Sequence, residues 1–278
     1  MKKSAKWFVP LFSLFVMVSF LAGCASVPRL DKSPTSISEL REISLGDVGV
    51  MWKDAEVLLM DVPLNRELTK NILPFGLCPT DPAMGTLVVV NYPVFPYGNP
   101  YHEAILMIHV QTLLGEGWHC AWILVDDDVA LIPGRELLGY PKKMGTFTFS
   151  GGKAGVQATV KRRGVKLLSV QAKRGAKEED PAPVFARKTF NVGGLGQMYA
   201  ISPLLLFNVE EKIKESYKAT VHLKMNRSIY DPIAEIISGP PVSARIVKFD
   251  ILDNDYYFML WMTGGRDWFL NTFNMRYR

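Results

Sequence analysis

Short runs of β-branched, aromatic and other apolar residues recur along the chain, separated by turns that contain glycine. The clearest pair flanks Gly151-Gly152, where Thr146-Phe147-Thr148-Phe149 alternates polar and apolar residues and residues 156–161 resume the alternation. A side-chain period of two is typical of strands with one buried face, and Gly-Gly suits a tight hairpin turn. The chain is therefore constrained to fold mainly as antiparallel sheet.

Runs of the same kind cover most of the sequence beyond residue 50. We expect further strands at residues 57–60, 86–90, 104–110, 118–125, 165–172, 218–225, 244–251 and 256–262. The run at 118–125 is almost wholly apolar, which is typical of a strand covered on both faces. Strands that follow one another through short turns favour an antiparallel sheet, closed or half-closed into a β-barrel.

Helical patterns are few, so the predicted class is α+β, with mostly antiparallel strands and a few flanking helices. Asn65 can cap a helix over residues 65–72, because asparagine is a good N-cap and a proline follows the last turn. Residues 128–138, capped by Asp128, form a second candidate helix, and residues 209–214 form a third.

The first residues have the pattern of an export signal. Three lysines among the first six residues precede an apolar run over residues 7–20. This run is shorter than the roughly 20 residues that a membrane-spanning helix needs. The next four residues, Leu21-Ala22-Gly23-Cys24, are similar to the processing box of bacterial lipoproteins.

The likeness to a lipoprotein implies cleavage before Cys24 and attachment of acyl chains to this cysteine. We therefore expect a signal peptide at residues 1–23, a membrane-proximal spacer at 24–45 and one folded domain at 46–278. Several acyl chains make a stable membrane anchor. Ala25 resembles the pattern sorted to an outer membrane, so we expect the bacterial cell envelope, at the outer membrane facing the periplasm. The sequence alone leaves inner and outer membrane open.

Charge and cysteine content constrain the partners. The formal charge of +5 includes the three signal lysines, so the mature chain carries about +2. Its lysines and arginines are dispersed, and nucleic acid is not an expected partner. Cys78 and Cys120 remain in the expected mature domain. A disulfide between them and two separate thiols both stay open.

The adjacent Lys142 and Lys143 carry the strongest chemical signal in the chain. Leucine, tyrosine and proline precede the pair, and two phenylalanines alternate beyond it, so the setting is half-buried. Neighbouring ammonium groups repel and burial penalises charge. Both effects lower the pKa of an amine and leave it free to attack a carbonyl as a Schiff-base nucleophile. An ordinary basic pair on a solvated turn is the alternative.

The segment Gly134-Arg135-Glu136-Leu137-Leu138-Gly139-Tyr140-Pro141-Lys142-Lys143 is similar to the active-site segment of the acetoacetate decarboxylase family. In that family the first lysine forms the Schiff base and the second lowers the pKa of the first. The resemblance implies that Lys142 is the nucleophile and Lys143 its electrostatic partner. A weaker resemblance extends from about Trp52 to about Asp250, and it implies a cone-like β-barrel with flanking helices.

The same resemblance implies roles for three more residues. A glutamate at the place of Glu103 lies in the family's active-site cavity, where it would pass a proton to the enamine carbon. A glutamate at the start of a strand, facing water, is the alternative. Arg135 and Glu136 belong to the matched segment. They either brace the lysine turn through an ion pair or hydrogen bonds, or contact the substrate, with Arg135 clamping a carboxylate.

The chain also departs from the family pattern. Decarboxylating members carry an arginine in an early strand that meets the substrate carboxylate, whereas residues 52–57 contain none and Lys53 is the nearest cation. A second cavity glutamate of the family falls among residues 88–90, which are all valine. The Schiff-base residues are kept and the carboxylate-handling residues are altered, which argues against acetoacetate itself as the substrate.

The resemblance thus implies an enzyme, a Schiff-base-forming lyase that decarboxylates a β-keto acid through an iminium on Lys142. The alternatives are a related aldolase or dehydratase, and a non-catalytic envelope lipoprotein that binds an apolar or carboxylate ligand in the same cavity. The expected partners are a small carbonyl or keto-acid substrate and the membrane. Neither a metal nor an organic cofactor is expected, because the iminium accepts the electrons. The family commonly forms homo-oligomers, and the sequence leaves this open here.

Overall fold

The computed structural model describes residues 52–95, 98–193 and 201–277 of the chain. The predicted signal peptide, the predicted spacer and Cys24 lie outside these residues. No helix in the described part is long and apolar enough to cross a membrane.

Strands dominate the described part of the chain and join in one 12-stranded sheet. The strands are β1 (Trp52–Pro63), β2 (Cys78–Pro79), β3 (Met84–Tyr92), β4 (Tyr101–Thr112), β5 (Gly115–Val125), β6 (Lys142–Met144), β7 (Thr146–Gly152), β8 (Gly155–Arg162), β9 (Val165–Lys177), β10 (Thr189–Val192), β11 (Ile201–Met225) and β12 (Ser243–Gly264). The helices are α3 (Arg66–Ile72), α4 (Asp128–Glu136), α5 (Ile233–Ile236) and α6 (Arg266–Arg276).

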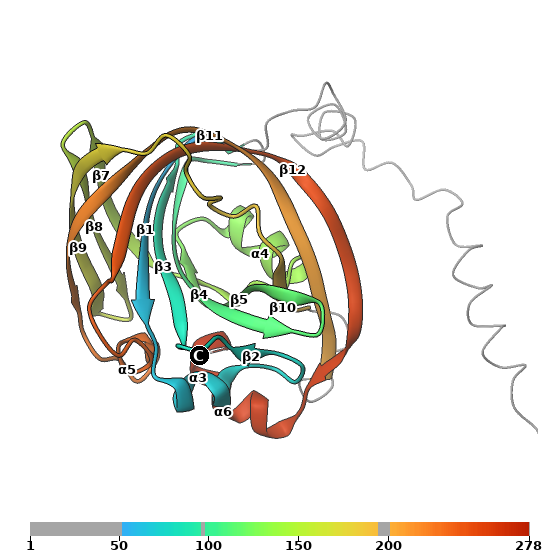
Figure 1. Cartoon of the computed structure of the whole chain (residues 1–278). Helices are drawn as coiled ribbons and strands as arrows, with labels where there is room; N and C mark the ends of the chain where they lie inside the picture. Colours follow the sequence, from blue (N-terminus) through green and yellow to red (C-terminus); the bar gives the residue numbers. More distant parts are fainter. Residues whose placement is uncertain (1–51, 96–97, 194–200, 278) are drawn as a thin grey trace, which may run out of the picture. The chain divides into compact units, whose positions relative to one another are not determined.

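The strands form a ring (Figure 1). Its order is β10-β5-β4-β3-β1-β12-β11, and the pairing of β10 with β11 closes it, while β9, β8 and β7 continue the sheet from β11. Neighbouring strands are antiparallel, except that β10 and β6 each pair in parallel with β5. The predicted class, mostly antiparallel sheet with a few helices, is confirmed.

Strands β1 and β5 of the ring are apolar on both faces. Along β1, Leu58 and Met60 enter one buried cluster, whereas Val57 and Leu59 enter a second one. The run at 118–125 is buried throughout, as predicted for a doubly covered strand. The second cluster borders the cavity that holds the candidate site, so the ring supplies its wall.

The predicted helix at residues 209–214 is wrong, because these residues lie inside β11 and pair with β12. Val209 and Ile213 are four residues apart, a spacing that shares a face in a helix and also in a strand. Register shifts beside Val209 and after Glu210 mark bulges. Bulges bend a strand, which suits a strand that curves around the ring.

Two of the predicted helices are present. In α3 the Asn65 side chain accepts a hydrogen bond from the backbone N–H of Leu68, as an N-cap should. The cap of α4 is Asp127 and not the predicted Asp128, since the Asp127 carboxylate accepts from the N–H of Ala130 at 2.9 Å. Asp127 and Asp128 are equally suitable N-cap residues by type, and the structure gives the extended backbone of a cap to Asp127.

The C-terminal helix α6 was not predicted, because aromatic residues with modest helix propensity mask its pattern. Its Trp268 is buried and donates a hydrogen bond from Nε1 to the carbonyl of Ile72 at the end of α3.

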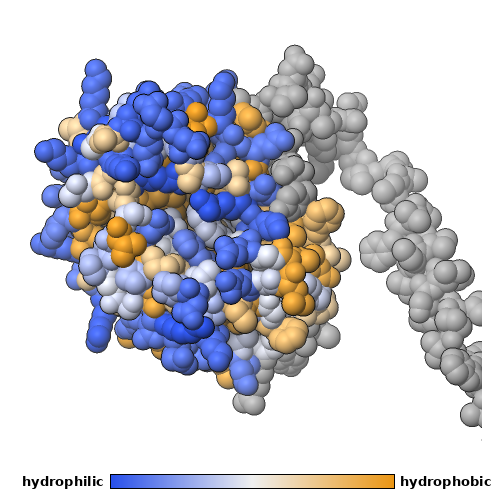
Figure 2. Space-filling view, in the orientation of Figure 1, coloured by the Kyte–Doolittle hydropathy of each residue, from blue (hydrophilic) through white to orange (hydrophobic). Residues whose placement is uncertain are grey.

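Large apolar side chains on β12, namely Phe258, Met259 and Met262, are exposed. Figure 2 shows an apolar patch along the side that β12 follows in Figure 1.

The two cysteines of the described domain are separate thiols. Cys78 is exposed on β2 and Cys120 is buried in β5, and neither forms a disulfide. Burial raises the pKa of the Cys120 thiol far above its usual value, so it stays protonated.

Candidate active site

The short strand β6 determines where the two lysines point. It pairs in parallel with β5, so that Lys142 lies opposite Ile123 and Lys143 opposite Leu124. Successive side chains of a strand point to opposite faces of the sheet. Lys142 therefore points into the cavity that Ile123 lines, and Lys143 points to the opposite face of the sheet.

The turn between α4 and β6 requires a glycine. Gly139 has a φ of 65°, in the left-handed region, and a Cβ there would collide with the backbone carbonyl of Val192. The N–H of Tyr140 donates to the carbonyl of Gly134 at 3.0 Å and closes the turn. The chain thus leaves α4 and enters β6 within a few residues, with Tyr140 directed at the cavity.

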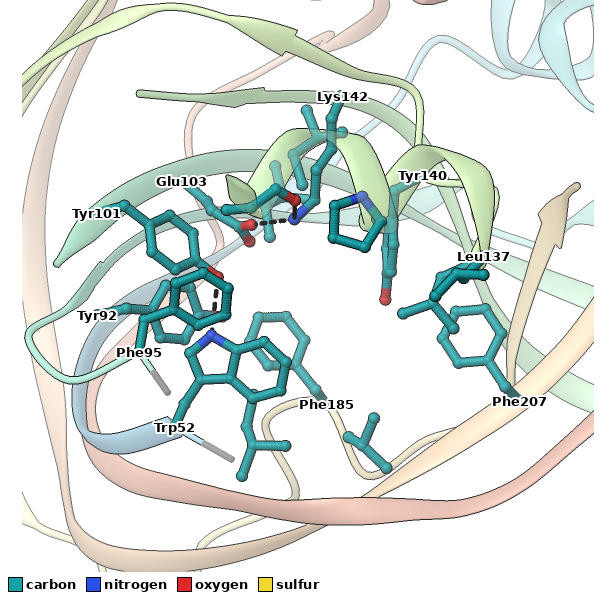
Figure 3. A pocket seen from close by; sticks show the side chains of 18 of the residues that line it. Trp52, Tyr92, Phe95, Tyr101, Glu103, Leu137, Tyr140, Lys142, Phe185 and Phe207 are labelled. Atoms are coloured by element: carbon teal, nitrogen blue, oxygen red, sulfur yellow. Dashed lines mark hydrogen bonds and ion pairs between the residues drawn. The ribbon is translucent and has the colours of Figure 1, made fainter. Parts of the chain in front are cut away.

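The cavity has a volume of about 650 Å³, and its walls are mostly aromatic and aliphatic. Its aromatic lining includes Trp52, Tyr92, Phe95, Tyr101, Phe185 and Phe207. Lys142 and Glu103 are the only two lining residues with a formal charge in the part of the chain that is described. Figure 3 shows this pair on one side of the cavity and Trp52 and Phe185 on the opposite side.

The Lys142 ammonium has a defined set of partners. Its Nζ lies 2.6 Å from Glu103 Oε1 and donates to the carbonyl of Ala130 at 3.0 Å. Lys142 is 8% exposed and Glu103 is 5% exposed. The rings of Tyr101 and Tyr140 each lie with their centroids 5.9 Å from Nζ. A buried amine and a buried carboxylate in contact can exchange a proton without water.

Space around Lys142 is tight on the side of α4. A Cβ added to Gly134 would lie 2.6 Å from the Lys142 Cε and 2.9 Å from its Nζ. Real Cβ atoms do not approach other atoms so closely, so a larger residue would force the lysine side chain to move. The absence of a side chain at Gly134 therefore leaves the space that the Lys142 side chain occupies.

The cavity lining also carries tyrosine hydroxyls. Burial raises the pKa of Tyr92, Tyr101 and Tyr140 well above the usual value, so these hydroxyls stay neutral and can donate hydrogen bonds. The Tyr101 oxygen already accepts from Trp52 Nε1 at 2.9 Å, which leaves its own hydrogen free to donate.

Lys143 belongs to a separate buried network on the other face of β6. Its Nζ lies 2.6 Å from Asp231 Oδ1 and donates to the carbonyl of Asn274 at 2.9 Å. Asp231, fully buried, also accepts from Trp122 Nε1 at 2.8 Å and from Arg162 at 3.1 Å. Burial lowers the pKa of Lys143 to about 8, against the opposing pull of Asp231. This placement does not favour the predicted electrostatic role beside Lys142.

A family model supports the resemblance of the lysine segment. The model for acetoacetate decarboxylase (ADC) matches residues 32–257, which is most of the chain. The chain belongs to the acetoacetate decarboxylase family. No curated protein sequence matches it.

Solved structures of the acetoacetate decarboxylase family and related enzymes share the fold. An acetoacetate decarboxylase has a TM-score of 0.69 and 15% identity over 76% of this chain and 88% of its own. The acetoacetate decarboxylase of Legionella pneumophila has a TM-score of 0.65 and 15% identity over 76% of this chain and 86% of its own. An acetoacetate decarboxylase-like enzyme from Sphingomonas wittichii RW1 has a TM-score of 0.64 and 18% identity, and covers 85% of this chain and 100% of its own.

Arg135 and Glu136, predicted either to brace the lysine turn or to contact the substrate, both lie outside the cavity lining. Arg135 donates from Nη1 to the backbone carbonyl of Lys142 at 2.7 Å and to that of Arg276 at 3.3 Å, and it does not line the cavity. Glu136 is exposed and also lies outside the lining. The last turn of α4 directs both side chains away from the cavity. Of the two roles predicted for Arg135, these hydrogen bonds fit the bracing one.

The departures from the family pattern persist in three dimensions. Lys53 is exposed on β1 and is not part of the lining. Val88 and Val90 lie in the apolar cluster beside the cavity. Among the described lining residues, Lys142 is thus the one cation that could meet a carboxylate.

The sequence reasoning missed most of the aromatic wall. Trp52, Phe185 and Phe207 come from β1, from the loop before β10 and from β11, so no local pattern links them to the lysines. Only Tyr140 stood within the recognised segment. The described residues hold no group of three or more His, Cys, Asp or Glu side chains placed to bind a metal ion.

Proposed function

We propose that this member of the acetoacetate decarboxylase family is a Schiff-base-forming lyase whose nucleophile is the Lys142 amine. One observation carries the proposal. The buried Nζ of Lys142 reaches into an apolar cavity and lies 2.6 Å from the carboxylate of Glu103. A carboxylate at this distance can take the ammonium proton and leave a neutral amine beside a bound carbonyl compound.

The first half of the proposed reaction forms the iminium. Glu103 accepts a proton from Lys142, and the Nζ lone pair attacks the carbonyl carbon of the substrate to give a carbinolamine. The protonated Glu103 returns this proton to the departing oxygen, which leaves as water. The products of this half are a protonated imine between Lys142 and the substrate, one water molecule and a Glu103 carboxylate.

The second half uses the iminium as the electron acceptor. When the substrate is a β-keto acid, the bond between the α-carbon and the carboxylate breaks, its electron pair moves to the iminium nitrogen, and carbon dioxide leaves. The enamine then takes a proton on carbon, and Glu103 is placed to supply one gained from solvent. Water hydrolyses the new imine and frees Lys142. Each electron pair stays on substrate and lysine, so the proposal needs no cofactor.

A second candidate reaction is favoured by the lining itself. No arginine, and no cation except Lys142, lines the described cavity, so nothing there is dedicated to a substrate carboxylate. An enamine on Lys142 could instead add to an aldehyde, as in an aldol condensation, with or without loss of water. Solved structures of the enzyme MppR, which has this fold with a TM-score of 0.63 and 15% identity, include one complexed with pyruvate. Another holds the condensation product of pyruvate and imidazole 4-carboxaldehyde.

Borohydride trapping tests the proposal. The folded protein is incubated with acetoacetate, acetylacetone or pyruvate, reduced with borohydride, and mapped by peptide mass spectrometry. We expect a reduced adduct on Lys142 and none in Lys142→Ala. Lys153→Met, which removes an exposed lysine, is the matched control and should keep the adduct. Folded protein that forms no adduct with any carbonyl compound would support a non-catalytic binding protein instead.

A further inference from the structure

We infer that the carbonyl substrate carries a large apolar body, a hydrocarbon chain or an aromatic group, attached to its reactive head. This inference rests on the proposed function, because it takes Lys142 as the point where the carbonyl carbon is held. It assigns the substrate class from the size, lining and polarity of the cavity.

The size of the cavity is the first argument. Its volume of about 650 Å³ equals that of roughly twenty water molecules at about 30 Å³ each. Cavities in the range of about 300–1,000 Å³ are typical of sites that bury drug-sized ligands. A three- or four-carbon keto acid would occupy a small part of this space and leave the rest of the apolar wall uncovered.

The distribution of charge is the second argument. The two formally charged lining residues, Lys142 and Glu103, contact each other on one side of the cavity, as Figure 3 shows. The opposite side presents Trp52 and Phe185. A second charged group on the ligand would face this apolar side without a partner, and burying an unpaired charge is strongly unfavourable. The lining therefore fits a ligand with one polar end and an apolar remainder.

The cavity lining holds neutral hydrogen-bond donors as well as the amine. The rings of Tyr101 and Tyr140 lie equally far from Lys142 Nζ, and both hydroxyls are kept protonated by burial. Such hydroxyls can donate to an uncharged oxygen or to the single carboxylate of a β-keto acid. They are neutral groups in a lining that is otherwise mostly apolar, so they add no second site for a charge.

The apolar wall opposite the amine is held in place by its own hydrogen bonds. The Glu211 carboxylate accepts from the backbone N–H groups of Val184, Phe185 and Ala186 at 2.6 to 3.1 Å. Arg245 donates to the carbonyls of two residues just before them. The segment that carries Phe185 is therefore anchored to the ring, and the space for the apolar body exists before the ligand binds.

A chain-length series tests this inference on the wild-type protein. Methyl ketones from acetone to 2-undecanone are reduced onto the protein with borohydride, and the second-order rate constant for the Lys142 adduct is measured for each. We expect this constant to rise by about fourfold for each added methylene, which follows from the burial of apolar area, until the cavity is full. Equal or falling rate constants along the series would overturn the inference while leaving the proposed function intact.

A cavity-filling variant tests whether the hydrocarbon chain of the ketone lies in this cavity. Val209 lines the cavity, and in Val209→Trp the gain in rate should end at a shorter ketone than in the wild type. Leu113→Trp is the matched control, because Leu113 is 99% exposed at the tip of the β4–β5 hairpin, and it should keep the wild-type series. If folded Val209→Trp and the wild type gave the same rate constants for every ketone, the hydrocarbon chain of the ketone would not occupy this cavity, and the inference would be overturned.

If no ketone is trapped at all, a measurement of binding alone separates the Schiff-base function from the apolar ligand class. Calorimetry of the same series against Lys142→Ala measures occupancy of the cavity alone. Affinity that rises with chain length would uphold the apolar ligand class, while the missing adduct refutes the Schiff-base function. No binding by any member of the series would overturn the inference as well.

Discussion

At the scale of single residues, the contact between Lys142 and Glu103 is the feature from which the proposed chemistry follows. Both side chains are buried, and the amine contacts the carboxylate and one backbone carbonyl. The sequence predicted both residues, because the segment around the lysines and the spacing to the glutamate resemble a known family. Lys143 was predicted as the electrostatic partner because the two lysines are adjacent in the sequence. In a strand, adjacent side chains point to opposite faces, and Lys143 contacts Asp231.

Replacement of Glu103 by glutamine tests the proton transfer. Glutamine keeps the size and one acceptor oxygen but cannot take a proton, so adduct formation at Lys142 should slow by about 10² to 10⁴-fold. The rate of borohydride trapping at saturating ketone measures the effect. Glu136→Gln removes an exposed carboxylate of the same segment and should react like the wild type. Equal rates in the two variants would remove Glu103 from the mechanism.

Replacement of Gly134 by alanine tests whether Lys142 needs the space that this glycine leaves. The new methyl group would lie 2.6 Å from the Lys142 Cε, so the side chain must shift and the amine leave its position. A displacement of about 1 Å can cost about 10²-fold in rate, so we expect a loss of this size in trapping with the fold retained. Gly152→Ala is the control, since a Cβ there meets nothing within 4 Å. An unchanged rate in Gly134→Ala would show that the lysine has room to spare.

At the scale of elements, the network around Asp231 joins parts of the chain that are far apart. It connects β6 through Lys143, β5 through Trp122 and β8 through Arg162, and Lys143 also reaches the carbonyl of Asn274 in α6. Burial lowers the pKa of Lys143, and the positive charge of Arg162 beside the same carboxylate lowers it further. The network therefore fixes β6, and with it the direction of Lys142.

The pH dependence of stability tests the state of Lys143. Its pKa falls from 10.5 in the unfolded chain to about 8 in the folded protein. Between these values the unfolded chain binds more protons, so the unfolding free energy should rise with pH, by at most about 1.4 kcal/mol per pH unit. Lys143→Met should remove this rise in denaturant titrations from pH 8 to 9.5, whereas the exposed control Lys153→Met should retain it. The same rise in both variants would contradict the shift.

The elements differ in how far the sequence predicted them. Strands with one or two apolar faces were recognised because a period of two is local, and α3 was recognised because Asn65 signals its start. Residues 209–214 were assigned to a helix because a spacing of four fits both structures, and only pairing with β12 distinguishes them. The direction of the lysines depended on β6, a three-residue strand too short to show a period.

At the scale of the whole molecule, the closure of the strands into a ring creates the cavity. The fold class followed from the strand pattern and from the lysine segment, since both are local. The cavity did not, because its wall brings together residues such as Trp52, Phe185 and Phe207 that are far apart along the chain. The loss of carboxylate-handling cations was visible in sequence, whereas the size of the apolar space was not.

We also propose that the protein is anchored in the bacterial envelope through acyl chains on Cys24. Labelled palmitate fed to cells that make the full chain should enter the protein, and the protein should partition into detergent. Cys24→Ser should abolish both. Cys78→Ser, which replaces an exposed free thiol, is the control and should keep the label. Label that persists in Cys24→Ser would refute the anchor.

Exchange of carbonyl oxygen with water tests the central claim most directly, because it reports imine formation whatever reaction follows. A ketone labelled with ¹⁸O loses its label when a lysine imine forms and is hydrolysed, and mass spectrometry measures the loss. We expect the wild type and Lys153→Met to accelerate the exchange and Lys142→Met to show only the uncatalysed rate. Equal acceleration by folded Lys142→Met would contradict the account.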